Sequence, residues 1–443
     1  MLPAGTAWYR LADDRETTLN HLRRLLCLLT LIAPPLLALT SCASPGMARG
    51  PAAQLDRLEI VSRAPAFGGA SFDAAGDYET IVAVAHMHIN VRHASNQGIV
   101  DLDRAGASGG SLAYKTDVVI VRPRDPAKAS RVLLFDLPSR GGRLFQRLAN
   151  EGGEDIATAA GVGTGFTMRR GHTMVWIGWQ GDIALAADGS RAGTDFPSVP
   201  LHGESSEEAV FDDIAESGVM RLSYAAASQD QSDARLTVRA SAAAAPITLP
   251  ASAWRYTGPT GIAFARVKGF DAGAIYRFQY RARDPKVMGL GMAAVRDVAS
   301  YLKSGALDGA GQANPLADLR PALALVVGVG QGGRFLRELI WQGFNADPRG
   351  GKVFDGAMPL LAGSGKSFVN ARFAQPDRVS TQHLDQLLPG DQFPFTYAVS
   401  TDPVSGKTDG IFARCRRDAS CPKLMHVVNQ SADIKPDSHA PGV

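Results

Sequence analysis

The stretch at 322–345, ALALVVGVGQGGRFLRELIWQGFN, constrains the fold of this chain more than any other segment. It begins with an unbroken apolar run, which is typical of a strand covered on both faces of a sheet. A glycine-rich turn follows, and apolar residues then recur at helical spacing. A buried strand that leads directly into a helix belongs to an α/β unit with parallel neighbouring strands. A further strand is expected in VFDGAMPLL at 353–361.

The other periodic segments agree with this fold class. Two continuously apolar runs, at 131–138 and 172–179, are expected to be central strands. A helix is expected over 287–305, where apolar residues recur at helical spacing before the closing Gly305. We therefore predict an α/β fold with a mostly parallel sheet and a strand-rich N-terminal half, whose strands could join the same sheet. The shorter strand-like runs are ETIVAVAHMHINV, LAYKTDVVIVRP, ARLTVRA, GIAFARV and AIYRFQY.

The N-terminus has the order of an export signal. Two arginines precede an apolar run at 25–39, which is too short for a membrane span of about 20 residues. The following Leu39-Thr40-Ser41-Cys42 resembles the lipobox of bacterial lipoproteins, so residues 1–41 are expected to be removed and Cys42 lipidated. An ordinary secretory signal with a nearby cysteine is the alternative. We expect a cell-envelope protein, anchored to the outer membrane or periplasmic, with a flexible tether at 42–57.

The charge balance excludes some partners. The chain has 443 residues and a formal net charge of only +3, with 45% hydrophobic residues, as in a soluble globular protein. Such a small excess gives no reason to expect nucleic acid as a partner. Contact with a membrane is expected only through a lipid on Cys42.

The export signal predicts an oxidising compartment, in which the two cysteines beyond Cys42 can pair. Cys415 and Cys421 lie in a short polar loop and are expected to form a disulfide. Zinc is the competing interpretation, but two further ligands at suitable spacing are missing. His86 and His88 alternate along one strand and could both bind a metal, although no nearby residue completes a ligand set. We predict neither a metal nor a cofactor.

The glycine-rich turn itself allows two interpretations. Residues 328–333 match G-x-G-x-x-G between a strand and a helix, and Asp355 follows near the distance expected for a ribose-binding acid. The second interpretation is a nucleophile elbow, a tight turn with small residues two before and two after the nucleophile. Gly328 and Gly332 supply these small residues, which places Gly330 at the nucleophile position.

Many segments in the same order resemble a family of large exported bacterial proteins of the alpha/beta hydrolase superfamily. The resemblance implies an alpha/beta-hydrolase-like sheet over 58–430. It also implies that Arg140 and Gly141, with the amide of Gln331, form an oxyanion site, and that Trp179, Gln180 and Asp182 line the pocket. The resembling segments are SRGG at 139–142, RRGHTMVWIGWQGD at 169–182, the long segment at 270–302, GRFLRELIWQGFN at 333–345, then KVFDGAMPLLAGS, RFAQP, DQFPF, TDPVSGKTDG and the Cys415–Cys421 loop.

Two departures from that family change the functional expectation. Its members have serines at the positions of Gly330 and Gly332, the first being the nucleophile. In the family the cysteine loop is followed by more sheet with the acid and the histidine of the triad. Here the sequence becomes polar and unlike the family at 431–443, which we expect to be an unstructured tail of a C-terminally truncated domain.

These features predict an ester-hydrolase fold whose catalysis is lost, because glycine offers no hydroxyl to attack an ester. One alternative is a binding protein for a small ester or carbonyl ligand, and another is a dinucleotide-binding protein. Ser364 is the one serine considered as a substitute nucleophile.

Overall fold

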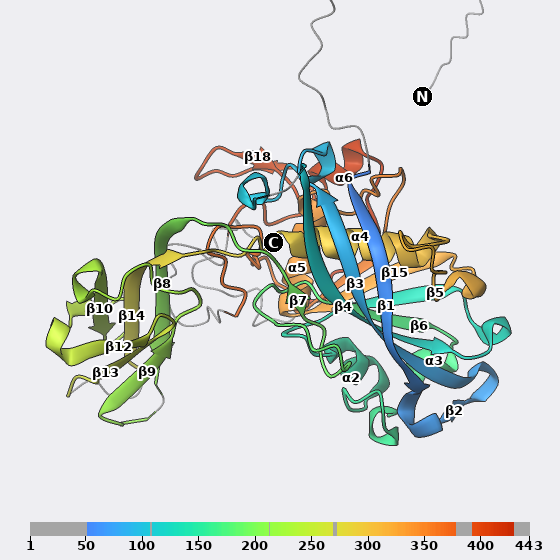
Figure 1. The fold of residues 1–443 in the computed structure, drawn as a ribbon, viewed down its shortest axis with the longest axis horizontal. Helices are drawn as coiled ribbons and strands as arrows, with labels where there is room; N and C mark the ends of the chain where they lie inside the picture. The colour runs from blue at the N-terminus through green and yellow to red at the C-terminus, as the bar shows by residue number, and fades with distance from the viewer. Residues whose placement is uncertain (1–50, 107–108, 212, 269–272, 378–391, 429–443) are drawn as a thin grey trace, which may run out of the picture. The chain divides into compact units, whose positions relative to one another are not determined.

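The computed structural model describes residues 51–106, 109–211, 213–268, 273–377 and 392–428 (Figure 1). The predicted signal, the proposed lipid site Cys42 and the predicted tail at 431–443 lie outside these ranges. Within them, no helix has the length and apolar character that a membrane span requires.

A large mixed sheet forms the centre of the fold, with the strand order β1-β3-β4-β6-β5-β15-β16-β19. Neighbouring strands are parallel from β6 to β19, which confirms the predicted α/β sheet. The pairs β1/β3, β3/β4 and β4/β6 extend it in antiparallel fashion. The strands are β1 (Ala53–Pro65), β3 (Gly76–Asn90), β4 (Ser111–Pro123), β5 (Val132–Leu137), β6 (Thr173–Ile177), β15 (Leu323–Val329), β16 (Gly356–Leu360) and β19 (Lys423–Leu424), with β2 (Ser71–Phe72) beside β3 and β7 (Thr194–Asp195) beside β4.

The central strands are those that the apolar runs predicted. All five residues of β6 are buried, as are five of the six residues of β5. Strand β1 begins at Ala53, so residues 53–57 of the segment predicted as a tether at 42–57 belong to a strand. This strand was not predicted because polar residues alternate along it. An edge strand with one exposed face need not be apolar.

Two helices of useful length pack against this sheet. Helix α4 (Leu290–Ser304) is the predicted helix, and the N–H of its closing Gly305 donates to the Tyr301 carbonyl. Helix α5 (Gln331–Trp341) follows β15 directly, as the glycine-rich turn predicted. The shorter helices of the described part are α2 (Leu144–Asn150), α3 (Phe166–Arg169) and α6 (Ala413–Arg417). Cys415 in α6 forms the predicted disulfide with Cys421.

Strands β3 and β4 join the large sheet as expected, whereas the strands between β7 and α4 form sheets of their own. Alternating burial identifies a strand such as β14 (Ile275–Arg283) but does not specify its neighbours, and the structure pairs it with strands of this same region. We call residues 202–283 the β-insertion. Its sheets have the orders β11-β10-β14-β8 and β12-β13-β9, built from β8 (His202–Val210), β9 (Ser217–Arg221), β10 (Ala234–Arg239), β11 (Ile247–Thr248), β12 (Trp254–Gly258), β13 (Gly261–Ala265) and β14 (Ile275–Arg283); β17 (Ser400–Thr401) and β18 (Thr408–Asp409) pair separately.

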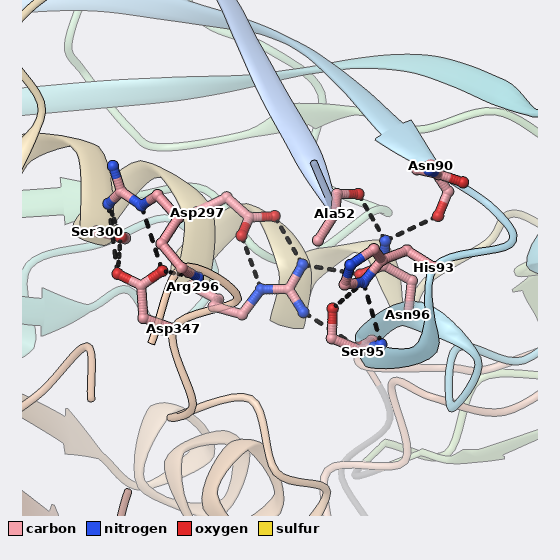
Figure 2. A network of polar contacts seen from close by, with 10 residues as sticks. Ala52, Asn90, His93, Ser95, Asn96, Arg296, Asp297, Ser300 and Asp347 are labelled. Carbon is pink, nitrogen blue, oxygen red and sulfur yellow. Dashed lines mark hydrogen bonds and ion pairs between the residues drawn. The ribbon is translucent and has the colours of Figure 1, made fainter. Parts of the chain in front are cut away.

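A buried arginine joins α4 to the turn that follows β3 (Figure 2). Arg296 is 1% exposed, and its guanidinium donates to both carboxylate oxygens of Asp297, at 2.7 and 2.9 Å. It also donates to the side-chain oxygen of Asn96 at 2.8 Å, and the Asn96 amide donates in turn to the Ala52 and Asn90 carbonyls. One turn further along α4, Ser300 donates to Asp347. This cluster fixes the amino end of β1 and the β3–β4 connection against α4.

Candidate active site

The turn between β15 and α5 is held in an unusual conformation at Gly330. Its φ of 54° and ψ of −109° lie in a region that L side chains rarely adopt. The Gly330 N–H donates to the Leu360 carbonyl at 2.8 Å, and the Gly330 carbonyl accepts from the Arg334 N–H at 3.0 Å. Backbone bonds on both sides therefore fix the turn in place.

The glycines of this turn differ in the space around them. A Cβ at Gly328 would overlap the backbone of Gly332, and a Cβ at Gly332 would lie 2.5 Å from the Leu137 carbonyl oxygen. At Gly330 nothing lies within 4 Å of an added Cβ. Strand and helix thus approach closely around a central position that faces open space, which is the geometry required of a nucleophile elbow.

The loop after β5 is attached to this turn by Ser139. The Ser139 hydroxyl donates to the Val329 carbonyl at 2.8 Å and accepts from the Gly332 N–H at 3.3 Å. The N–H groups of the first helical turn have no intrahelical partner, and Gln331 is the first residue of α5. The bonds of Ser139 therefore bring the predicted Arg140–Gly141 loop close to the Gln331 N–H.

Arg140 connects three loops at the carboxyl end of the sheet. Its Nη1 lies 2.7 Å from a carboxylate oxygen of Asp182, a predicted pocket residue, and its Nε lies 3.2 Å from one of Asp377. Arg140 and Gly141 both have positive φ, which bends the loop sharply. Sequence reasoning missed Asp377, because nothing in its local pattern distinguishes it from a surface acid.

Two glutamine side chains form a second link. Gln180, which is buried, donates to the Gln331 side-chain oxygen at 2.8 Å, and the Gln331 amide donates to the Pro376 carbonyl. Trp179 lies beneath the site rather than on its surface, since it is only 1% exposed. Its ring stacks on Phe335 with centroids 4.0 Å apart, and its N–H donates to the Pro138 carbonyl at 2.7 Å.

Comparison with known families supports this geometry. A family model described as an alpha/beta hydrolase domain matches residues 195–440, which is more than half of the chain. The chain belongs to the alpha/beta hydrolase domain family. The matched segment includes the Gly330 turn. The loop that carries Arg140 lies before the matched segment in the sequence. No match to this alpha/beta hydrolase is found among curated proteins.

A buried carboxyl group lies in the strand below the Arg140 loop of this hydrolase domain. Asp136 of β5 is 3% exposed and accepts a hydrogen bond from the Trp176 indole N–H at 2.8 Å. Burial raises the pKa of Asp136 to about 7, although the indole hydrogen bond and the nearby Arg143 guanidinium act in the opposite direction. The sequence feature that could have revealed this buried carboxyl is the single acidic residue in the apolar run RVLLFDLP.

Among the described residues, no hydrogen bond, ion pair or ring contact joins a histidine to residues 328–333. His172 bonds to Ser130, and His426 packs edge-to-face on Tyr397. Ser364, the substitute nucleophile considered above, makes no hydrogen bond to a histidine or carboxylate in the same part of the chain.

The residues considered for a dinucleotide site and for a metal site lie away from the Gly330 turn or make other pairs. Asp355 accepts from the Ala324 N–H and from Lys303, both at 2.9 Å, at the amino end of β15. Gly330 lies at the carboxyl end, so Asp355 cannot serve as the ribose acid of a dinucleotide site at this turn. His86 pairs with Glu59 and His88 with Asp56, and no group of three potential metal ligands occurs among the described residues.

Proposed function

We propose that this protein is an alpha/beta hydrolase of the carboxylic-ester hydrolase type that has lost its attacking nucleophile. The observation that carries the proposal is Gly330, which holds at the elbow a conformation that would be strained for a serine and which has no side chain. The turn keeps the two neighbouring glycines that close packing requires, so the scaffold for a nucleophile persists without the hydroxyl. Loss of a catalytic serine typically lowers turnover about a million-fold.

A second candidate function is the binding of a small carbonyl ligand without reaction. The observation that favours it is the combination of the Gln331 N–H, which has no helical partner, with open space above Gly330. A preorganised N–H at a helix start can stabilise a partly negative carbonyl oxygen. In this function the elbow would hold the ligand, and the missing hydroxyl would prevent its hydrolysis.

Hydrolysis of p-nitrophenyl esters tests the first function. We expect negligible turnover by the unmodified chain and by Gly330→Ser, because a serine hydroxyl needs an adjacent base and no described histidine contacts the elbow. Gly330→Ala is the matched control, since it has the same backbone strain without the hydroxyl. Turnover that follows the unmodified chain through purification would contradict the proposal, and Ser364→Ala would then locate the nucleophile.

A further inference from the structure

The segment Arg372–Asp377, which we call the strap, is firmly held along its first four residues. Arg372 pairs with the buried Asp101, its Nε lying 2.8 Å from the carboxylate. Tyr224 of the β-insertion donates to the Ala374 carbonyl, and its ring packs edge-to-face on Phe373 with centroids 5.1 Å apart. The Gln375 amide donates to the Ser206 carbonyl at 3.0 Å and to Glu207 at 2.9 Å. Phe373, Ala374 and Gln375 are all buried.

The last two residues of the strap contact the elbow and its neighbouring loop. The Pro376 carbonyl accepts from the side chain of Gln331, the residue that follows Gly330. Asp377 pairs with Arg140, which Asp182 binds from the other side. The side chain of Asp377 is 73% exposed, against 34% for Arg140 and 24% for Asp182. The strap therefore joins a fixed, buried part to an exposed ionic contact.

We propose that the Arg140–Asp377 pair is a latch that limits access of small molecules to position 330. The inference takes the Gly330 turn as the site, and so rests on the function proposed above. An exposed ion pair of this kind favours the closed arrangement by roughly two- to five-fold and weakens as salt rises. The latch therefore opens often, while Arg140 keeps Asp182 as a partner and the buried contacts of Phe373 and Gln375 stay intact.

A cysteine at the elbow measures this access without requiring catalysis. Gly330→Cys in the full chain places a thiol where an added Cβ meets nothing within 4 Å. Its alkylation by iodoacetamide and by a bulky neutral maleimide is followed by mass spectrometry of the peptide that contains residue 330. Rates are compared at their high-pH plateau, where the thiol is fully ionised, so that a change of thiol pKa does not imitate a change of access.

Adding Asp377→Asn is expected to raise the plateau rate about two- to five-fold, more for the maleimide than for iodoacetamide. Salt should accelerate labelling while Asp377 is present and have little effect once Asp377→Asn has removed the charge. Asp377→Glu, which keeps the carboxylate, should leave the rate unchanged. Asp73→Asn is the matched control, because Asp73 is 64% exposed and pairs with Arg169. Equal plateau rates for Gly330→Cys with and without Asp377→Asn would overturn the proposal.

Hydrogen exchange gives a second test that leaves Gly330 in place. In the otherwise unmodified chain, Asp377→Asn should increase exchange of the amides at 329–334, and unchanged exchange would contradict the latch. These measurements separate the two proposals. Activity of the unmodified chain would overturn the proposed loss of catalysis and leave the labelling difference standing, whereas equal labelling would remove the latch and leave the esterase results unaffected.

Discussion

The Gly330 turn and the Arg296 cluster differ in what their unusual features contribute to the fold. At the turn, Gly330 has a backbone conformation that L side chains rarely adopt, and a Cβ added there would meet nothing within 4 Å. In the cluster, a buried charge is fully engaged by Asp297 and Asn96 and joins separate parts of the chain. An uncommon backbone conformation that supports no side-chain packing points to function, whereas a satisfied buried network is explained by structure alone.

The largest effect is expected from breaking the cluster. Arg296→Met should lower the free energy of unfolding by about 3 to 5 kcal/mol, because the largely covered Asp297 side chain, 11% exposed, would lose its partner. Urea unfolding measures the loss as a lower midpoint at unchanged slope. Arg283→Met is the control, since the Arg283 side chain is 45% exposed and its pair with the equally exposed Asp284 is worth at most about 1 kcal/mol. Similar losses in both variants would remove the contrast between the cluster and the surface.

An intermediate effect is expected at Asp136, the buried carboxyl under the Arg140 loop. Its pKa is raised to about 7 in the folded protein, against an ordinary value of about 4 in the unfolded chain. Between these values the folded state retains a proton that the unfolded state has lost, so this group lowers stability as pH rises from about 4 to about 7.

Asp136→Asn should remove this pH dependence. The variant should match the unmodified protein near pH 4 and exceed its stability near pH 8 by on the order of 4 kcal/mol. Urea unfolding at several pH values measures the difference, with the exposed Asp73→Asn as control. A parallel pH profile for Asp136→Asn would show that the carboxyl does not titrate in this range.

The smallest effect distinguishes two glycines within the turn. Gly330→Ala should lower stability by about 1 to 2 kcal/mol, through backbone strain alone. Gly328→Ala adds a side chain that overlaps the Gly332 backbone, so it should reach or exceed the upper end of the roughly 1 to 3 kcal/mol expected for overpacking. Thermal and urea unfolding of the two variants, compared directly, check the order. The reverse order would mean that a side chain at position 330 meets neighbours rather than open space.

The sequence predicted those features whose residues are neighbours in the chain. The elbow was recognisable because its strand, glycines and helix are consecutive, and α4, β5 and β6 followed from unbroken or helical apolar patterns. The disulfide was predictable because Cys415 and Cys421 are separated by only a short loop. In these cases local chemistry already determines the structure.

Features that depend on distant pairing were not predictable. The bond from Ser139 to Val329 spans 190 residues, and the bond from Gln180 to Gln331 spans 151. Strands β10, β13 and β14 read as ordinary strands, and no local pattern states which sheet they enter. Asp377 resembles any surface acid until the fold places it beside Arg140. The spacing of apolar residues shows which face of a strand or helix is buried. It does not show which other strand or helix packs against that face.

The position of the β-insertion has a consequence for the assembly of the elbow. It lies within the long loop that is closed when β5 pairs with β15, about 190 residues later. The entropy of closing a flexible loop depends only on the logarithm of its length, and each doubling adds about 0.6 kcal/mol. The roughly 80 residues of the insertion therefore raise the closure cost by less than that amount. A whole additional unit can thus occupy this connection while the two strands that form the site still meet.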